Sequence, residues 1–563
     1  MIIGLDVGGT HTDAVLIGAE GVVREIKVST DTDRLFETLM ATLEQLTENL
    51  DKSTIKRLVL STTLATNMVV QQQLPPVAVL VSAGPGIDPE YFRVGDHYHV
   101  VDGALDHSGR EIASLDERQI TAIGEDLQQE GVLYAAVISK FSVRNPAHEK
   151  RIAELLAPYV DHVFMGHTLS GILSFPRRIA TAYLNGAVCP VHSKFFEAVQ
   201  QSLKAHGLDV PIRILKPDGG NMNVSASLYY PAQTILSGPS ASVMGAIATA
   251  PKDKTCLVLD IGGTTTDMAV ILNGAPIIAS QGIEIGSYKT LIRALLTKSI
   301  GIGGDSVVRA QDGKITIGPD RQGVAMVYGG RTITPTDALC ALGLIEGVDR
   351  LKGVETLMAL SEELNRPVPE IAEMIFTTAC QNILSAAQDM VDQINSRPVY
   401  TVHEMFEGMT VTPDHIQVLG GPAKQFAEKL ATLFDGTVST VPHWHVANAI
   451  GCALSRTTCE VTVYVDTARN IITAQGEELD KAVSRDMGLK EVRQIAFDLV
   501  RQKAIQRGAI PEYLQMEVIE ESQFNMIRGY SSSGKNIRVR AQVKPGLISG
   551  YDPETGKLSR DDF

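Results

Sequence analysis

The chain has 563 residues, of which 44% are hydrophobic and 20% are charged, a composition typical of globular proteins. A single core seldom serves more than roughly 300 residues, so we expect several domains. The 50 basic and 65 acidic residues give a formal net charge of −15. This acidity argues against nucleic acid and anionic membranes as partners, because both attract basic surfaces.

Six cysteines are spread along the chain without a C-x-x-C pair. They are too sparse to cross-link a chain of this size and are typical of reduced thiols in a cytoplasmic protein. The first residues, MIIGLDVGGT, carry no basic leader and soon reach a charge at Asp6. This start predicts neither a signal peptide nor a membrane anchor, and no apolar stretch reaches the roughly 18 residues of a membrane helix.

The predicted elements alternate between strands and helices. IIGLDV, a pair of glycines and DAVLI predict a strand, a turn and a second strand within the first 18 residues. Ser114 and Glu117 form a capping-box pattern that predicts a helix ended by Gly131, and LYAAVI follows as a buried strand. Asn145-Pro146 predicts the start of another helix. This alternation predicts α/β layers around mixed or parallel sheets.

The chain also contains an internal repeat. LDVGGTHTDAVLI at residues 5–17 recurs as LDIGGTTTDMAVI at residues 259–271. A spacing of 254 residues is far beyond the period of a solenoid, so it indicates a duplicated domain. We therefore predict two similar lobes, at residues 1–185 and 186–459, and a small C-terminal α+β domain at residues 460–563.

Both copies contain the pattern D-x-G-G-T-x-T-D, which suits a phosphate group. Glycines allow a tight turn that brings backbone N–H groups close to an anion, and threonine hydroxyls add donors. The leading Asp6 and Asp260 end their strands, where they can hold a hydrated Mg²⁺, and Asp13 and Asp267 follow on the next strands. A glycine-rich hairpin without a ligand is the alternative for one copy, and the duplication argues against it. The predicted phosphate-binding residues are Gly8, Gly9, Thr10, Thr12, Gly262, Gly263, Thr264 and Thr265.

The paired loops resemble those of the actin-like ATPase superfamily, in which loops from two lobes hold the β- and γ-phosphates across a cleft. This resemblance implies an α/β fold with two actin-like (ribonuclease-H-like) lobes around a nucleotide cleft, with ATP and Mg²⁺ as cofactors. The chain also resembles the hydantoinase A/oxoprolinase family from Met1 to about Ser455. The segments that carry this resemblance, in family order, are LSTTLATNMVV (60–70), GALDHSGREIASLDE (103–117), FSVRNPAHEKRI (141–152), LSGPSASVMGA (236–246), SIGIGGDSV (299–307), TPTDALCALG (334–343) and VLGGPA (418–423).

The family resemblance implies further site residues. A glycine cluster beside the nucleotide matches Gly301, Gly303 and Gly304, and the turn on the adenosine side matches Gly420 and Gly421. A segment facing the γ-phosphate or the substrate matches Thr62, Thr63, Thr66 and Asn67, of which we take Thr63 and Asn67 as catalytic candidates. A plain turn is the alternative for the glycine pair, and an N-capped helix start is the alternative for the threonine segment.

Some positions depart from the family pattern or carry weaker signals. Lys298 and Asp305 stand where the family usually has a histidine and a glycine, and the segment after Gly166 lacks the family's acidic G-E-Y-E-R stretch. These departures leave the substrate open. His443 and His445 could bind a metal only from one strand face, and a structural role is favoured for both.

The resemblance implies an ATP-dependent hydrolase subunit that phosphorylates a cyclic amide or imide, such as a hydantoin, oxoproline or another lactam, for ring opening. Phosphorylation would supply a good leaving group, with catalytic roles for Asp6, Asp13, Asp260 and Asp267. The implied partners are the cyclic amide and a B-type hydantoinase subunit or further copies of the chain. Two alternatives stay open: an actin-like ATPase that activates or remodels a partner enzyme, and an ATP-dependent carboxylase subunit.

Overall fold

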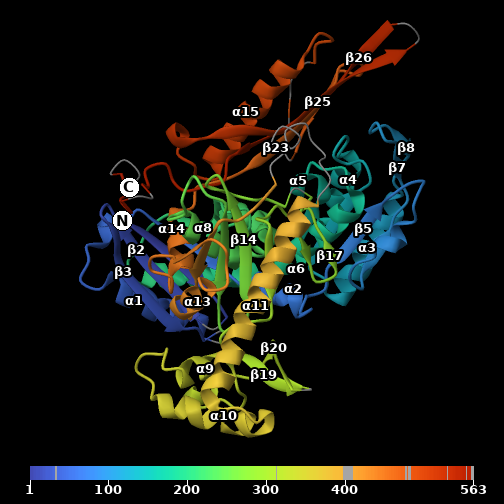
Figure 1. Cartoon of the computed structure of the whole chain (residues 1–563). Helices are drawn as coiled ribbons and strands as arrows, with labels where there is room; N and C mark the ends of the chain where they lie inside the picture. The colour runs from blue at the N-terminus through green and yellow to red at the C-terminus, as the bar shows by residue number, and fades with distance from the viewer. Residues whose placement is uncertain are drawn as a thin grey trace.

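A computed structural model describes the chain except for residues 10, 32–33, 280, 312, 397–409, 476–478, 480–482, 529–530, 553–554 and 560–563. Two lobes carry a C-terminal domain at one end, and a mainly helical insertion of the second lobe projects at the other (Figure 1). Among the helices it describes, none is long and apolar enough to cross a membrane.

The first lobe is built on a six-stranded sheet in the order β12-β11-β4-β1-β2-β3. β1, β2 and β3 form an antiparallel meander, and β4 and β11 continue the sheet in parallel with β1. Leucines of α1 and phenylalanines of the second half of α6 cover one face of this sheet. The elements are β1 (Ile2–Val7), β2 (His11–Gly18), β3 (Gly21–Ser29), α1 (Leu35–Thr47), β4 (Arg57–Thr62), α2 (Leu64–Val70), α6 (Phe175–Ala205), β11 (Ile212–Leu215), β12 (Asn221–Asn223) and α7 (Val224–Tyr229).

The second lobe repeats this topology. Its sheet has the order β15-β14-β13-β21-β22, with an antiparallel meander followed by two strands parallel to β13. α11 and α13 cover its outer face. The elements are β13 (Cys256–Ile261), β14 (Thr266–Leu272), β15 (Ala275–Pro276), β18 (Thr297–Ile300), α11 (Val368–Asn395), β21 (His415–Leu419), α13 (Ala423–Leu430) and β22 (Thr437–Thr440). The repeat in the sequence is therefore a repeat of a fold.

Two helices, α8 (Ser237–Ile247) and α14 (Ala447–Leu454), cross between the two sheets. Their backbones touch, since a Cβ atom at Gly245 would lie 2.1 Å from the Ala447 carbonyl oxygen, and one at Gly451 would lie 2.0 Å from that of Ala241. Only glycine fits at such distances. The two contacts are reciprocal, so the helices are related by an approximate two-fold axis.

Each lobe carries an insertion. In the first lobe, the parallel sheet β10-β9-β5-β6 packs against the first half of α6. Its elements are β5 (Ala78–Ser82), β6 (Tyr98–Val100), β7 (Ala104–Leu105), β8 (Glu111–Ala113), α3 (Glu117–Glu130), β9 (Tyr134–Ser139), α4 (Ala147–Leu156), β10 (His162–Met165) and α5 (Gly166–Leu169). In the second lobe they are β16 (Glu284–Ile285), β17 (Tyr288–Lys289), β19 (Ser306–Gln311), β20 (Lys314–Arg321), α9 (Pro335–Ala341) and α10 (Arg350–Leu364).

The helix predicted after Ser114 exists, but its predicted cap is wrong. Asp116 caps α3 by accepting hydrogen bonds from two backbone N–H groups, while the Ser114 hydroxyl donates to Glu111 instead. Gly131 ends the helix in the left-handed region with φ 72°, as predicted. Asn145 accepts from the Ala147 N–H at the start of α4, which confirms the second predicted helix start.

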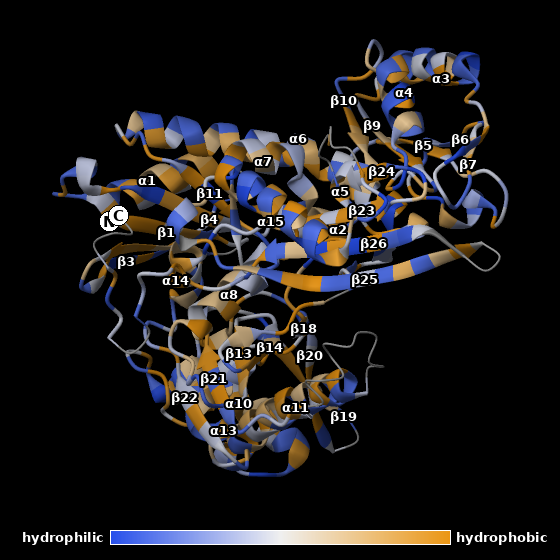
Figure 2. Ribbon diagram, turned by 90° about the horizontal axis from the view of Figure 1, so that it is seen from above, coloured by the Kyte–Doolittle hydropathy of each residue, from blue (hydrophilic) through white to orange (hydrophobic). Residues whose placement is uncertain are grey.

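The C-terminal domain is an antiparallel sheet in the order β24-β23-β26-β25, with α15 on one face. Its elements are β23 (Glu460–Asp466), β24 (Ile471–Ala474), α15 (Leu489–Gln506), β25 (Met516–Arg528) and β26 (Ser531–Val543). In Figure 2 the central strands of both lobes are largely hydrophobic, whereas α6 alternates hydrophilic and hydrophobic residues. The strands are buried on both faces, whereas α6 is buried on all sides from Arg178 to Cys189 and on one face in its second half.

The predicted division after residue 185 falls inside α6, and β11 and β12 belong to the sheet of the first lobe. We therefore propose that the first lobe ends after Asn223. The second predicted division, after residue 459, coincides with the start of β23 at Glu460.

Candidate functional site

The two copies of the repeat make the same turn. The Gly8 N–H donates to the His11 carbonyl oxygen at 3.0 Å, and the Gly262 N–H donates to that of Thr265 at 2.9 Å. Asp6 lies directly opposite Asp13 in the β1–β2 ladder, as Asp260 lies opposite Asp267 in the β13–β14 ladder. The repeat therefore extends to hydrogen bonds and strand register.

Strand alternation sets the direction of the four aspartates. Along β1 and β2 they share a face with Ile2 and Val15, and along β13 and β14 they share a face with Val258 and Ala269. These apolar residues belong to the core around α8 and α14. All four carboxylates therefore point to the region between the lobes.

Asp6 is buried, with 7% of its surface exposed. Its carboxylate accepts hydrogen bonds from the Ser61 hydroxyl and from the Asn448 amide, and the same amide group donates to Asp13 at 2.9 Å. Burial raises the pKa of Asp6 to about 7, the charges of Asp13 and Asp260 add to this rise, and the two hydrogen bonds oppose it.

In the second copy, the pKa values of Asp260 and Asp267 are also raised. Asp260 accepts from the Ser242 hydroxyl of α8, and burial, together with the charge of Asp13, raises its pKa. Burial and the neighbouring Asp260 raise the pKa of Asp267 to about 6, against a hydrogen bond from Ser299. Carboxylates that are buried together in this way would be stabilised by a cation.

Among the described residues, no three His, Cys, Asp or Glu side chains form a complete metal-binding group. Mg²⁺ ordinarily keeps several waters and takes one or two carboxylates together with phosphate oxygens. Asp6 and Asp260 therefore fit Mg²⁺ that arrives with a nucleotide, rather than a metal held by protein ligands alone.

The trailing aspartate of the first copy is ion-paired. Asp13 contacts the Lys27 ammonium group at 2.7 and 2.9 Å, and Lys27 also donates to the His445 carbonyl oxygen at 3.0 Å. Lys27 lies on β3 directly opposite Asp13. An Asp13 carboxylate held by Lys27 and Asn448 is less available as a base than an unpaired one.

The two loops lie close enough to influence each other's charges. Burial lowers the pKa of His11, which follows the first glycine pair, and Lys27 and Arg321 lower it further, whereas Asp13 and Asp305 raise it. Arg321 and Asp305 belong to the second lobe, where they form an ion pair at 3.0 Å. The first loop thus faces the second, as the duplicated motif predicts.

Three of the glycines predicted beside the nucleotide lie against the second loop. The Gly304 N–H donates to the Gly262 carbonyl oxygen at 2.9 Å, and a Cβ atom at Gly303 would lie 2.6 Å from the same oxygen. Gly420 has φ +95°, and its Cβ position lies 2.6 Å from an Asp260 carboxylate oxygen. Gly421 has open space around it, whereas Gly301 packs on Pro319.

The threonine segment lies beside the first loop. The Thr63 N–H donates to the Val7 carbonyl oxygen at 3.2 Å, and the exposed Asn67 places its amide nitrogen 3.6 Å from the Cβ position of Gly9. Thr63 begins α2, yet its hydroxyl makes no capping bond. The Thr62 and Thr66 hydroxyls instead accept from the N–H groups of Leu64 and Leu236.

The loop threonines do not all face the site. Thr10 lies outside the described residues. Thr12 is fully buried on the opposite face of β2 from Asp13, where its hydroxyl pairs with that of Thr30 at 2.8 Å. The Thr264 hydroxyl accepts from Arg321 at 3.2 Å, and Thr265 contributes its carbonyl oxygen to the turn.

The weaker candidates make structural contacts. His443 and His445 both pair with Glu25 of β3, at 2.6 and 3.1 Å. Lys298 donates to the Ala386 carbonyl oxygen of α11 at 3.0 Å. These side chains join the strands of the two lobes to neighbouring segments.

Sequence reasoning missed residues that contact the four aspartates or the second loop. These are Lys27, Ser61, Ser242, Arg321 and Asn448. Ser242 and Asn448 each stand three residues before the glycine at which the helices cross, a spacing that a comparison of the two lobes could have found. Lys27 and Arg321 carry no such signal, because only strand pairing brings them to the loops.

Comparison with known proteins shows the family. The hydantoinase/oxoprolinase profile matches residues 178–461, and the profile of the family's N-terminal region matches residues 2–160. The chain therefore belongs to the hydantoinase/oxoprolinase family.

Three relatives show how far the similarity extends. An uncharacterized protein of Methanocaldococcus jannaschii is 24% identical over 87% of this chain and 78% of its own length. The caprolactamase subunit alpha of Pseudomonas jessenii is 23% identical over 65% of this chain, and the acetophenone carboxylase gamma subunit of Aromatoleum aromaticum is 25% identical over 74%. The matches span only 58% and 64% of those two subunits, less than two thirds of their length.

Two solved structures share the fold. Nucleotide-free acetone carboxylase superimposes with a TM-score of 0.71 at 18% identity, over 99% of this chain and 88% of that one. The ATP-dependent caprolactamase of Pseudomonas jessenii gives the same TM-score and identity, over 96% and 87%. The predicted fold, two actin-like α/β lobes with a small C-terminal α+β domain, is confirmed.

Proposed function

We propose that the chain is an ATP-dependent enzyme subunit that binds Mg-ATP between its two repeated loops and transfers the γ-phosphoryl group to a small substrate. The observation that carries this proposal is the pair of matching turns with their four aspartates, whose carboxylates point to the region between the lobes. Relatives named as a caprolactamase subunit and a carboxylase subunit support it.

Different residues of the chain would hold the phosphates, hold Mg²⁺ and orient the carboxylates. N–H groups of Gly9 and Gly263 would receive the phosphates, with a further contribution from Gly421, while the N–H groups of Gly8, Gly262 and Gly304 hold the turns in shape. Asp6 and Asp260 would hold Mg²⁺, which neutralises phosphate charge when bound. Lys27 and Arg321 add positive charge beside the loops, and Ser61, Ser242 and Asn448 keep the carboxylates oriented.

We further propose that the acceptor is the carbonyl oxygen of a cyclic amide or imide, held near Thr63 and Asn67. The carbonyl oxygen would attack the γ-phosphorus, forming an O–P bond as the bond to the β–γ bridging oxygen breaks and ADP leaves. Water would then add to the activated carbon, and the ring C–N bond would break as the nitrogen takes a proton, which leaves an acyl phosphate. A second water would hydrolyse this acyl phosphate to the carboxylate and free phosphate. A B-type subunit is our proposed partner for this hydrolytic step, and the relatives' naming as subunits supports a partner.

A carboxylase subunit is the second candidate, because the acetophenone carboxylase gamma subunit is a relative of similar identity. The hydrolase and carboxylase proposals share the ATP site and differ in the molecule that accepts the phosphoryl group. We also propose a cytoplasmic location, which the six free and buried cysteines support.

The test is ADP release measured with lactams, hydantoins and 5-oxoproline, and separately with ketones plus bicarbonate, each with and without a B-type subunit. Acceleration by a cyclic amide supports the hydrolase, and acceleration by a ketone with bicarbonate supports the carboxylase. Acceleration by a partner protein alone would instead support an ATPase that activates or remodels that partner.

A further inference from the structure

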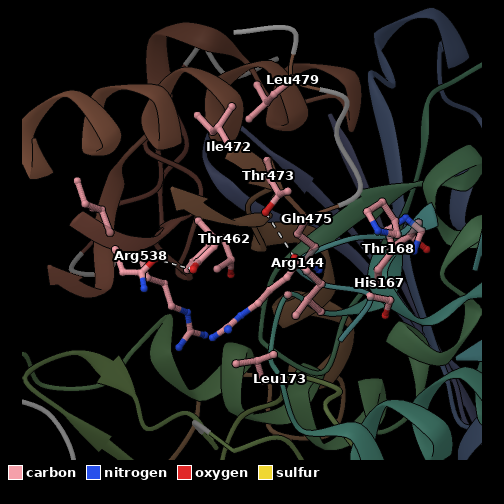
Figure 3. A pocket seen from close by; sticks show the side chains of 18 of the residues that line it. Arg144, His167, Thr168, Leu173, Thr462, Ile472, Thr473, Gln475, Leu479 and Arg538 are labelled. Carbon is pink, nitrogen blue, oxygen red and sulfur yellow. Dashed lines mark hydrogen bonds between the residues drawn. The ribbon is translucent and has the colours of Figure 1, made fainter. Parts of the chain in front are cut away.

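A cavity of about 820 Å³ lies between the C-terminal domain and the insertion of the first lobe (Figure 3). None of its described lining residues belongs to the repeated loops. One wall is the segment around residues 142–150 and the start of α5, and the other is the C-terminal sheet. Arg469 donates to the Ser108 carbonyl oxygen at 3.0 Å and so joins the domain to the insertion.

Strand alternation divides the C-terminal sheet into two chemically different faces. One face carries valines and other apolar residues that pack against α15. The other face presents Thr462 and Tyr464 from β23, Arg538 from β26, and Glu520 and Ser522 from β25 to the cavity. A polar sheet face can face solvent without a helix or a second sheet packed on it. Here this face forms the floor of the cavity.

Positive charge exceeds negative charge among the described lining residues. The basic ones are Arg144, Lys150 and Arg538, and Glu520 is the acidic one that faces them, apart from the pairing of His167 with the buried Glu149. Arg538 contacts Glu520 at 2.9 Å. The described lining is therefore basic, although the chain as a whole has a formal net charge of −15.

Two arginines meet at one aromatic ring. The Arg144 guanidinium lies over the Tyr464 ring, 5.2 Å from its centre, and Arg538 is the cross-strand neighbour of Tyr464. Figure 3 shows both arginine side chains reaching into the same part of the cavity. Glu520 pairs with Arg538, and the Arg144 guanidinium donates to the His107 carbonyl oxygen. Two guanidinium groups beside this one carboxylate leave room for a second anion.

A buried donor completes the polar end of the cavity. The Thr462 hydroxyl is buried and has no hydrogen-bond partner among the described residues, although such a group normally finds one. Apolar side chains also line the cavity, among them Leu173 between α5 and α6, and Ile472 and Phe524 on the C-terminal sheet. The cavity thus offers two guanidinium groups, a buried hydroxyl donor and apolar side chains.

We propose that this cavity is a second ligand site, separate from the nucleotide loops, that binds an organic monocarboxylate with an apolar body. The carboxylate lies between Arg144 and Arg538 and accepts from the Thr462 hydroxyl, and the body packs on Leu173, Ile472 and Phe524. Guanidinium groups select a carboxylate over a neutral amide of the same shape, because charge-assisted hydrogen bonds are about twice as strong as neutral ones. The site does not depend on ATP.

Calorimetric titration of the full chain without nucleotide tests the site, with hexanoate against hexanamide and 4-phenylbutanoate against 4-phenylbutanamide at constant ionic strength. We expect each carboxylate to bind at least about tenfold more tightly than its amide, as a lost charge-assisted contact is worth that much. Arg538→Met and Thr462→Val should remove most of this preference.

The matched control is Arg493→Met. Arg493 pairs with Glu521 at 2.8 and 3.0 Å, and Glu521 lies next to Glu520 on β25 but does not line the cavity. This control should leave binding unchanged. If Arg538→Met unfolds the chain, the double variant Arg538→Met with Glu520→Gln is used instead of the single variant. The double variant leaves no unpaired carboxylate at position 520. Equal binding of acid and amide in both pairs, or an equal loss in the Arg493 control, would overturn the proposal.

Discussion

Asn448, on the helix that follows the second lobe, donates a hydrogen bond to Asp6 on the first strand of the first lobe. The relationship is reciprocal, because Ser242, on the helix that follows the first lobe, donates to Asp260 on the first strand of the second. Each lobe therefore supports the leading carboxylate of the other. Any motion that separates the lobes would also change the hydrogen bonds of the two residues that we expect to hold Mg²⁺.

The first prediction concerns this support. Asn448→Ala removes one donor from Asp6 and one from Asp13, so we expect the free energy of unfolding to fall by about 1–3 kcal/mol. ATP hydrolysis should fall more than stability explains, because the carboxylates lose their orientation. Urea unfolding and ADP release on the same samples check this. Unchanged hydrolysis in a folded Asn448→Ala protein would remove Asn448 from the site.

The second prediction is a pH dependence of stability in the absence of Mg²⁺. The folded-state pKa of Asp6 is about 7, against an ordinary value of 3.8, so the folded chain binds more protons between these pH values. Stability therefore falls as the pH rises from about 4 to about 7, and this contribution stays constant above that range.

Asp6→Asn should flatten this part of the pH profile, raise the stability of the metal-free chain at pH 8, and abolish most ATP hydrolysis. Thermal melts at pH 5 and pH 8, each with and without Mg-ATP, check the prediction. The Asp51→Asn variant serves as the control, because that carboxylate is exposed and remote from the loops. A wild-type pH profile in Asp6→Asn would contradict the raised pKa.

The sequence predicted the repeated turns and the placing of the aspartates because both are local: glycines make the turn, and strand alternation directs the aspartates. It could not reach Lys27, Arg321 and Asn448, which come from a third strand, a hairpin and a crossing helix. It misplaced the cap of α3 because Ser114 and Asp116 both suit an N-cap, and only the backbone decides between them. The same alternation could have excluded Thr12 from the site, because Thr12 is next to Asp13 on β2 and so points to the opposite face.

The third prediction uses two glycines with different surroundings. Alanine at position 303 would place a Cβ atom 2.6 Å from the Gly262 carbonyl oxygen, whereas alanine at position 421 meets no atom within 4 Å. We expect Gly303→Ala to lower the free energy of unfolding by roughly 1–3 kcal/mol and to weaken ATP binding. Gly421→Ala should keep wild-type stability to within about 0.5 kcal/mol.

Melting curves and equilibrium binding of an ATP analogue to both variants check these outcomes. Weaker binding in Gly421→Ala at unchanged stability would place that turn at the nucleotide. Wild-type binding in both variants would argue that the ligand lies elsewhere.

The fourth prediction separates residues that would meet the acceptor from those that hold the segment. The Thr63 hydroxyl makes no capping bond and Asn67 is exposed beside Gly9, so Thr63→Ala and Asn67→Ala should leave stability nearly unchanged. Thr66 accepts from the Leu236 N–H at 2.8 Å, and Thr66→Ala should lower the free energy of unfolding by about 1 kcal/mol.

Stimulation of ADP release by the substrate should fall at least about tenfold in Thr63→Ala and Asn67→Ala, as expected when a hydrogen bond to the reacting group is lost. The rate without substrate should change little, because neither side chain is expected to touch the nucleotide. Steady-state ADP release, with and without substrate, measures both effects, and an equal loss of the two rates would place the segment at the γ-phosphate rather than at the acceptor.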